Sequence, residues 1–310
     1  MNGFVPGPKI PVHTLSRFFR ENFGGKVRKV ALDAGFSCPN RTGAERKGGC
    51  LWCDPHGSGP GPADADWESA LRREAAKLLD KGYAGAISYF QAFTGTFGEI
   101  PRLEETYEKS LSVPGVLGIA IGTRPDCLSG EVLDLLGRLN GRTFLWVEVG
   151  MQTMHDPTLA LCGRGHRHSE TRAAFGRLRD LGIRTVLHLI AGLPGETEDM
   201  MMESFAEAAG MKPWGLKLHP LHVVRGSALE GWFNGGRLNL LELREYARLA
   251  ASLIEMTGRE TVFHRITGER PEGVLLAPAW CLDKDRVRRE IHEALRVRGG
   301  FQGRLAEVLD

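Results

Sequence analysis

Short apolar runs rich in β-branched residues alternate with amphipathic, helix-like segments six times along this chain. The runs occupy residues 26–32, 85–90, 116–121, 143–149, 184–190 and 214–219. Between them, apolar residues recur with the 3.6-residue period of a helix. Such alternation predicts a parallel sheet with crossover helices, because parallel neighbours need a long return connection. Six strands are too few for a full eight-stranded barrel, so we predict an α/β fold, either an open doubly wound sheet or a partial (β/α)6 barrel.

The two ends of the chain depart from this alternation. An apolar helical stripe precedes the first strand, and residues 1–25 are predicted to form an N-terminal helical cap. Residues 26–225 are then the barrel. Residues 226–310 are predicted to form a C-terminal helical extension, with helices over 239–256 and 285–298. No Pro/Ser-rich linker or charge run separates the extension from the barrel, so we expect it to pack on the barrel rather than form an independent domain.

The composition excludes several classes of protein. The 310 residues carry 40 Lys and Arg against 38 Asp and Glu, a net charge of +2, and 42% are hydrophobic. That apolar content is enough for a core, so the chain is not intrinsically disordered. No apolar run approaches the roughly 18 residues of a membrane-spanning helix, and the N-terminus lacks an apolar signal core. We therefore expect a cytoplasmic protein with no membrane partner, whose near-neutral charge argues against a surface that wraps nucleic acid on all sides.

Three of the six cysteines lie close together, directly after the first predicted strand. Cys38, Cys50 and Cys53 have the spacing C-x11-C-x2-C on a glycine-rich loop. In a reduced compartment, closely spaced cysteines bind metal or do chemistry more often than they form disulfides. Thiolates suit both zinc and Fe–S clusters, and His56 would complete a closed Cys3His zinc site. The position at the carboxyl end of a strand, where α/β folds build active sites, favours a cluster with one iron left open.

Further sequence blocks accompany the cysteine loop in a fixed order. They are LDAGFSCPNR at 32–41, YFQAFTGTF at 89–97, IGTRPDCL at 121–128, VEVGMQT at 147–153, RGH at 164–166, HLIAGLPGE at 188–196, KLHPLHVV at 217–224, HRITG at 264–268 and LAPAWC at 276–281. With the strand pattern, these blocks resemble the radical S-adenosylmethionine (SAM) superfamily. Most members space their cysteines C-x3-C-x2-C; the longer spacing resembles the YhcC/YtqA-like family, distantly similar to the catalytic subunit of elongator. The resemblance implies a partial (β/α)6 radical SAM barrel with a C-terminal helical extension.

The resemblance also implies an enzyme with two cofactors. Cys38, Cys50 and Cys53 would each ligate one iron of a 4Fe–4S cluster, and the fourth iron would bind the amino and carboxylate groups of SAM. One-electron reduction, by an external donor such as flavodoxin or ferredoxin, would cleave SAM into methionine and a 5′-deoxyadenosyl radical that abstracts hydrogen from a substrate. In such enzymes the cofactors carry the hard chemistry, while the protein orients and shields the radical.

Polar residues after the second and third strands are the first predicted SAM contacts. The superfamily holds the SAM amino group with a Gly-Gly-Glu-like motif after the second strand. This chain has Gln91 and Thr94 there, and a polar strand-to-helix turn is the alternative. Arg124 follows the third strand, where its guanidinium suits a carboxylate, either that of SAM or that of the nearby Asp126.

The fourth and fifth strands end in further candidates. Glu148 and Gln152 are predicted to contact the ribose of SAM. The alternative for Glu148 is a structural ion pair with Arg124 or Arg164, because a carboxylate inside a barrel rarely lacks a partner. Arg164 is a candidate contact for SAM or substrate, with a polar loop as its alternative. His188 ends the fifth strand beside glycines that would allow close approach to the adenine.

The substrate is less constrained than the reaction. Some relatives of this family are associated with tRNA wobble-uridine modification, which makes tRNA a candidate partner. Residues 283–304 carry seven Lys and Arg against four Asp and Glu. A basic helix suits RNA phosphates, and a solvated helix face with salt bridges is the alternative. Two other interpretations stay open: a radical SAM enzyme acting on a small molecule or protein side chain, and a zinc-stapled α/β binding protein without redox chemistry.

Overall fold

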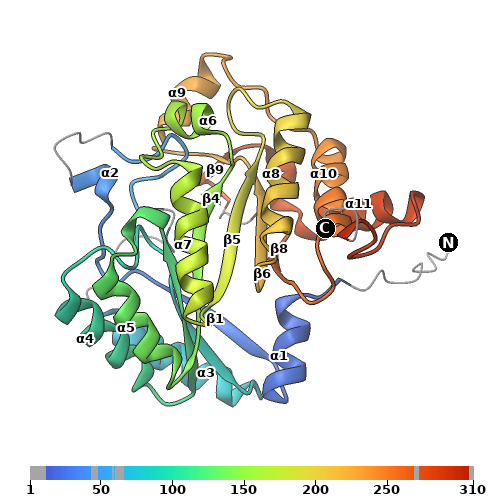
Figure 1. Cartoon of the computed structure of the whole chain (residues 1–310). Helices are drawn as coiled ribbons and strands as arrows, with labels where there is room; N and C mark the ends of the chain where they lie inside the picture. The colour runs from blue at the N-terminus through green and yellow to red at the C-terminus, as the bar shows by residue number, and fades with distance from the viewer. Residues whose placement is uncertain (1–11, 43–47, 58, 60–65, 269–271, 307–310) are drawn as a thin grey trace.

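A computed structural model describes residues 12–42, 48–57, 59, 66–268 and 272–306 of the chain (Figure 1). Its main feature is a parallel sheet of seven strands in the order β1-β2-β3-β4-β5-β6-β8. The strands are β1 (Val27–Leu32), β2 (Gly85–Phe90), β3 (Val116–Thr123), β4 (Phe144–Gln152), β5 (Arg184–Ala191), β6 (Gly215–Pro220) and β8 (Val262–Arg265). The first six are those expected from the alternation, so the prediction of an α/β partial barrel is confirmed.

Helices connect the successive strands and cover the outer face of the sheet. They are α3 (Trp67–Asp80), α4 (Ile100–Leu111), α5 (Gly130–Asn140), α7 (His168–Asp180) and α8 (Glu198–Gly210). Figure 1 shows α4, α5, α7 and α8 on one side of the sheet. Each helix buries an apolar stripe in one continuous core, which includes the fully buried Leu71, Leu103, Leu136 and Leu178. This layering follows from the right-handed crossover that parallel strands adopt.

The sheet curls strongly enough to bring distant strands face to face. Lys29 on β1 and Lys217 on β6 both contact the carboxylate of Glu148 on β4, at 3.3 and 2.9 Å. Neighbouring strands lie about 4.8 Å apart, so in a flat sheet β1 and β6 would be separated by roughly 24 Å. The shared contact therefore requires an incomplete barrel whose interior is lined by side chains from every second position of each strand.

Helix α1 (Leu15–Phe23) closes the barrel at the amino ends of the strands (Figure 1). Its buried Phe19 packs in a cluster with the fully buried Trp146 on β4. Because strand side chains alternate between faces, Trp146 and Glu148 share the inner face. The interior thus changes from an aromatic base at α1 to a polar layer at Glu148. The first eleven residues of the predicted N-terminal cap lie outside the described residues.

The C-terminal part adds helices, as expected, and one strand that the sequence analysis did not predict. Helix α10 (Leu243–Met256) packs against α8 and α11 (Lys284–Val297). The unpredicted strand is β8, which extends the barrel sheet beyond β6. It has four residues and a register shift, too little for a recognisable period. Residues 239–242, predicted as helix, precede the start of α10.

Smaller elements surround the carboxyl ends of the strands. They are α2 (Pro39–Thr42), α6 (Asp156–Leu161), α9 (Ala228–Asn234) and an antiparallel pair, β7 (Val223–Val224) with β9 (Leu275–Ala277). Figure 1 shows α6 and α9 at the end of the barrel opposite α1. Among the residues that the structure describes, no helix has both the length and the apolar character needed to cross a bilayer.

Candidate active site

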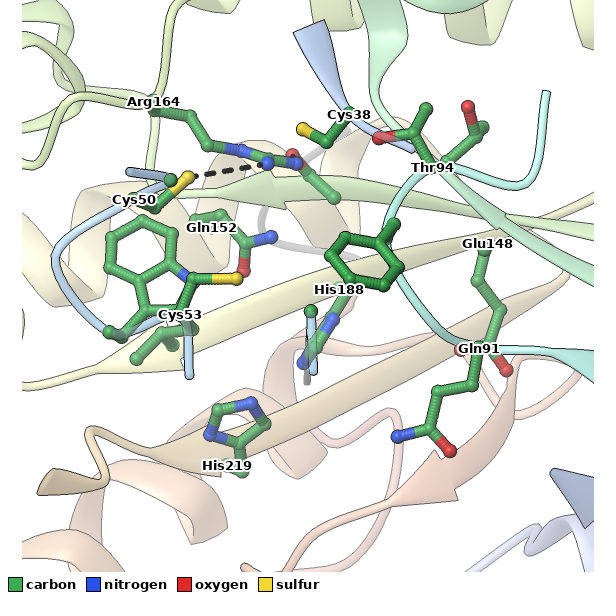
Figure 2. Close-up of a pocket in the computed structure, with 18 of the residues that line it drawn as sticks. Cys38, Cys50, Cys53, Gln91, Thr94, Glu148, Gln152, Arg164, His188 and His219 are labelled. Carbon is green, nitrogen blue, oxygen red and sulfur yellow. Dashed lines mark hydrogen bonds between the residues drawn. The ribbon is translucent and has the colours of Figure 1, made fainter. Parts of the chain in front are cut away.

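A pocket lies inside the barrel, toward the carboxyl ends of the strands. Its wall includes all three cysteines of the C-x11-C-x2-C loop and six of the seven predicted SAM contacts: Gln91, Thr94, Glu148, Gln152, Arg164 and His188 (Figure 2). Arg124 does not line it. Side chains more than a hundred residues apart in the sequence therefore meet in one cavity, as expected for strand-end loops of an α/β barrel.

The cysteine loop is shaped by short-range hydrogen bonds. Cys38 immediately precedes α2, and its carbonyl accepts the Arg41 N–H at 2.8 Å, which starts that helical turn. The Cys53 N–H donates to the Cys50 carbonyl at 2.9 Å and brings these two cysteines into one turn. Gly49, just before this turn, has φ +106°, and a Cβ there would lie 3.3 Å from the Cys53 Cβ. Glycine at position 49 thus permits a backbone conformation that other residues rarely adopt.

N–H donors lie close to all three cysteine sulfurs. Arg41 Nη2 is 3.4 Å from the Cys53 sulfur, and Arg164 Nη1 is 3.7 Å from that of Cys50, as Figure 2 shows for the latter pair. Arg124 Nη1 is 3.9 Å from the Cys38 sulfur. Asn40 also donates to Cys50 at 3.4 Å. Donors of this kind stabilise negative charge on sulfur.

Arg124 is held by protein groups rather than aimed into the pocket. Its guanidinium donates twice to Asp126, at 2.9 and 2.6 Å, in the bidentate geometry that guanidinium and carboxylate favour. It also donates to Asn40 Oδ1 and to the Gly165 carbonyl. Of the two partners considered for Arg124, the structure shows Asp126. The Asp126 pairing considered from the sequence is therefore confirmed, and the contact of Arg124 with SAM stays a prediction.

Glu148 is the centre of a buried polar cluster at the base of the pocket. Its carboxylate accepts the Tyr89 hydroxyl at 2.6 Å and pairs with Lys217 at 2.9 Å and Lys29 at 3.3 Å. Neither Arg124 nor Arg164, the partners considered from the sequence, is among the recorded contacts of Glu148. Burial alone would raise the Glu148 pKa, but the two lysine charges outweigh it and hold that pKa well below its usual range. Burial lowers the Lys217 pKa to about 8 against the opposing effect of Glu148.

Sequence reasoning missed Lys29 and Tyr89 in this cluster. Both occupy inward positions of their strands, Lys29 on β1 and Tyr89 on β2. The available signal was the strand period itself, because a charged residue at an inward position needs a partner across the barrel. The partner is not readable from the sequence, since Lys29 and Glu148 are separated by 119 residues.

A bulge at the end of β4 directs Gln152 toward the pocket. The pairing of β4 with β5 shifts register between Val149 and Gln152, and Gln152 has φ +68°, which is unusual for a residue with a side chain. A Cβ at Gly150 would lie 2.4 Å from Arg164 Nη2 and 2.6 Å from Gln152 Nε2. Glycine at position 150 therefore lets both side chains approach the strand closely.

Four of the predicted contacts have buried polar atoms without a hydrogen-bond partner among the described residues. These atoms are Thr94 Oγ1, Gln152 Oε1, Arg164 Nε and His188 Nε2. Leaving such a group unpaired costs about 1–3 kcal/mol, so native proteins nearly always satisfy it. All four residues line the same pocket. Their grouping indicates that the pocket receives a polar ligand.

Histidines form the wall that β5 and β6 contribute. The rings of His188 and His219 are 4.8 Å apart, and the ring of His222 stacks on His219 at 5.0 Å. Burial, followed by the Lys217 charge, holds the His188 pKa well below its usual range. Burial, followed by the two neighbouring histidines, does the same for His219. Both imidazoles are therefore neutral at pH 7, and this wall offers uncharged nitrogen atoms.

Two known protein-family models match most of the chain that forms this pocket. The model described as "Radical SAM superfamily" matches residues 41–208, and the model described as "Radical_SAM C-terminal domain" matches residues 213–296. The chain belongs to the radical SAM superfamily. It is 40% identical over 301 residues to the uncharacterized protein YtqA of Bacillus subtilis, covering 96% of this chain and 94% of that protein. This likeness confirms the resemblance to the YhcC/YtqA-like family.

Two other relatives of this radical SAM protein are more distant. A tRNA uridine(34) acetyltransferase of Dehalococcoides mccartyi is 36% identical over 147 residues, which are 46% of this chain and 30% of that protein. The solved structure of the archaeal Methanocaldococcus infernus Elp3 superposes with a TM-score of 0.66 at 20% identity, covering 76% of this chain and 60% of that one. The chain thus spans less than two thirds of either protein. The structural likeness supports the radical SAM fold.

As a radical SAM enzyme, the protein uses a 4Fe–4S cluster and SAM. The cysteine loop fits the cluster: Cys38, Cys50 and Cys53 line one pocket and each sulfur has an N–H donor. The zinc alternative fits less well. His56 is exposed and does not line the pocket. The four unpaired polar atoms match a ligand as polar as SAM.

Proposed function

We propose that this enzyme cleaves SAM reductively and uses the resulting radical to modify a uridine in tRNA. The supporting observation is the likeness to the tRNA uridine(34) acetyltransferase, whose matched part covers 46% of this chain. The fold likeness to an Elp3 is consistent with it. In this proposal the bound cluster, reduced by an external donor such as flavodoxin or ferredoxin, supplies the electron for SAM cleavage. The side chains of the pocket bind the cluster and SAM and orient them.

We propose that Cys38, Cys50 and Cys53 hold the cluster and that the rest of the pocket holds SAM. The proposed SAM contacts are Gln91 and the four residues that each have one buried polar atom without a partner among the described residues, namely Thr94, Gln152, Arg164 and His188. Neutral imidazole and amide groups suit the hydroxyls and ring nitrogens of a nucleoside. The enclosing barrel keeps water from a reactive radical.

Glu148 takes a different role in this proposal from the one expected. Its carboxylate already accepts from Tyr89, Lys29 and Lys217, so its capacity for ribose hydroxyls is largely used. We propose instead that Glu148 positions Lys217 and Tyr89, which line the base of the pocket beside it.

The basic C-terminal segment, residues 283–304, has fewer charges available for RNA phosphates than its composition predicts. Arg288 pairs with Asp285 and Arg296 with Glu293 on the same helix. Arg298 and Arg304 both contact the buried Glu255 of α10. At least four of the seven basic side chains of residues 283–304 are therefore paired within the protein. This pairing favours the alternative of a solvated face with salt bridges. The tRNA proposal consequently rests on the relative rather than on this helix.

Comparison of tRNA from cells with and without the gene tests the substrate. We expect a uridine-derived nucleoside to disappear, or its precursor to accumulate, when digested tRNA from the deletion strain is analysed by liquid chromatography and mass spectrometry. Wild-type enzyme should restore the profile, whereas a Cys50→Ala variant should not, because cluster chemistry is required. Identical nucleoside profiles in the two strains would remove tRNA as the substrate and leave the radical SAM assignment untouched.

A further inference from the structure

Two guanidinium groups beside the cysteine loop, those of Arg41 and Arg164, form no ion pair with a carboxylate of the described residues. Arg41 Nη2 is 3.4 Å from the Cys53 sulfur, and Arg164 Nη1 is 3.7 Å from the Cys50 sulfur. Among the described residues, the recorded ion pairs include neither arginine, whereas Arg124, beside Cys38, is paired with Asp126 at 2.6 Å. The uncompensated charge is therefore concentrated at the Cys50–Cys53 turn.

Arg41 is fixed in place by contacts on both sides. Its guanidinium donates to the carbonyl groups of Asp54 and Pro55, directly after the cysteine turn. One face lies over the Phe93 ring, 5.2 Å from the ring centroid. Gly57 makes room for that ring, because a Cβ there would lie 2.4 Å from a Phe93 ring carbon. A side chain held this firmly presents its charge to the sulfur at little further entropic cost.

Arg164 is fixed in a similar way from the other side of the pocket. Its Nη2 donates to the Gly150 carbonyl at 3.1 Å, and the side chain is 8% exposed. Charges in such a water-poor setting act more strongly than charges on the surface. Together, Arg41 and Arg164 place two fixed cations against neighbouring sulfur ligands.

We propose that Arg41 and Arg164 are positioning residues that raise the reduction potential of the cluster. One-electron reduction adds one negative charge to the cluster, and a nearby cation stabilises that state more than the oxidised one. Hydrogen bonds to ligand sulfur act in the same direction. The inference depends on the cluster and not on the tRNA substrate, so it stands or falls separately from the proposed function.

The midpoint potential of the cluster in variants loaded anaerobically tests this inference. We expect Arg41→Gln and Arg164→Gln to shift the potential to more negative values while iron content and visible absorbance stay at wild-type levels. Arg41→Lys, which keeps the charge but loses the planar donor fork, should fall between wild type and Arg41→Gln. Arg102→Gln is the matched control, because Arg102 also donates to a loop carbonyl, that of Gly35 at 2.8 Å, without contacting a cysteine; its potential should not change.

A purely structural role for Arg41 predicts a different pattern. If Arg41 only clamps the loop, Arg41→Gln would lose iron or leave the potential of the remaining cluster unchanged. Should Arg41→Gln fail to hold the cluster, Arg164→Gln and Arg41→Lys decide the question, because neither removes both the charge and the loop contacts of Arg41. Wild-type potentials in both of these loaded variants would overturn the inference.

Discussion

Replacing Cys50 with alanine is expected to leave a protein that folds but loses most of its iron and its broad absorbance near 400 nm. Cys50 is the most buried of the three pocket cysteines and receives N–H donors from Asn40 and Arg164. Removing its sulfur takes away one of the three proposed cluster ligands and the acceptor that faces Arg164 Nη1. Cys38→Ala and Cys53→Ala should behave in the same way, as measured by iron analysis and visible spectroscopy of anaerobic protein.

Cys281→Ala is the matched control for this loss. Cys281 is also buried, but it lies in a small apolar cluster with Val224 and Leu275 and does not line the pocket. That variant should retain full iron and colour, with at most a modest loss of stability from the small cavity. Retained colour in all three pocket-cysteine variants would contradict the assignment of the ligands.

Replacing Glu148 with glutamine is expected to destabilise the protein by about 3 kcal/mol, because the buried Lys217 and the half-buried Lys29 lose the carboxylate charge that they share. Lys217 is 3% exposed, and Lys29 approaches the same carboxylate from β1. The expected loss stays near the lower end of the range for broken buried pairs, because Lys217, with a pKa of about 8, can give up its proton. Denaturant unfolding of the two proteins at pH 7 measures the difference.

Two further measurements separate charge from packing at Glu148. Adding Lys217→Met to Glu148→Gln should recover part of the lost stability, because one stranded charge is removed. The Glu148 pKa is lowered in the folded state, so its stabilising effect is present above the usual carboxyl pKa and fades as pH falls through the folded value. The gap between wild type and Glu148→Gln should therefore narrow in acid. Equal stabilities at pH 7 would show that the carboxylate does not hold the barrel interior together.

The strand pattern predicted most of the fold because a helix of clear period lies between each two successive strands from β1 to β6. β8 escaped because it is four residues long and is paired with β6 only in part. The position of β8 depends on its pairing with β6, which the sequence of β8 alone does not reveal. The start of α10 also differed: Glu242 caps the helix, and residues 239–242 precede it.

The candidate site was predictable where chemistry is local in sequence and much less so where it depends on contacts across the barrel. Cys38, Cys50 and Cys53 share one loop, so spacing and position after a strand were enough. Glu148 was recognised as a buried carboxylate, but its partners Lys29 on β1 and Lys217 on β6 come from strands on opposite sides of β4 in the curled sheet. The curvature of the sheet determines which strands face each other across the barrel. The alternation of apolar and polar residues along one strand does not reveal that curvature.

Incubation of the anaerobically loaded protein with SAM and a strong one-electron reductant tests the central claim most directly. A radical SAM enzyme of this architecture should release 5′-deoxyadenosine and methionine, measured by liquid chromatography. Release should require the reductant and should be absent in Cys50→Ala. Protein that carries its full complement of iron, shows the absorbance of a 4Fe–4S cluster, and yet forms no 5′-deoxyadenosine under reducing conditions would contradict the account.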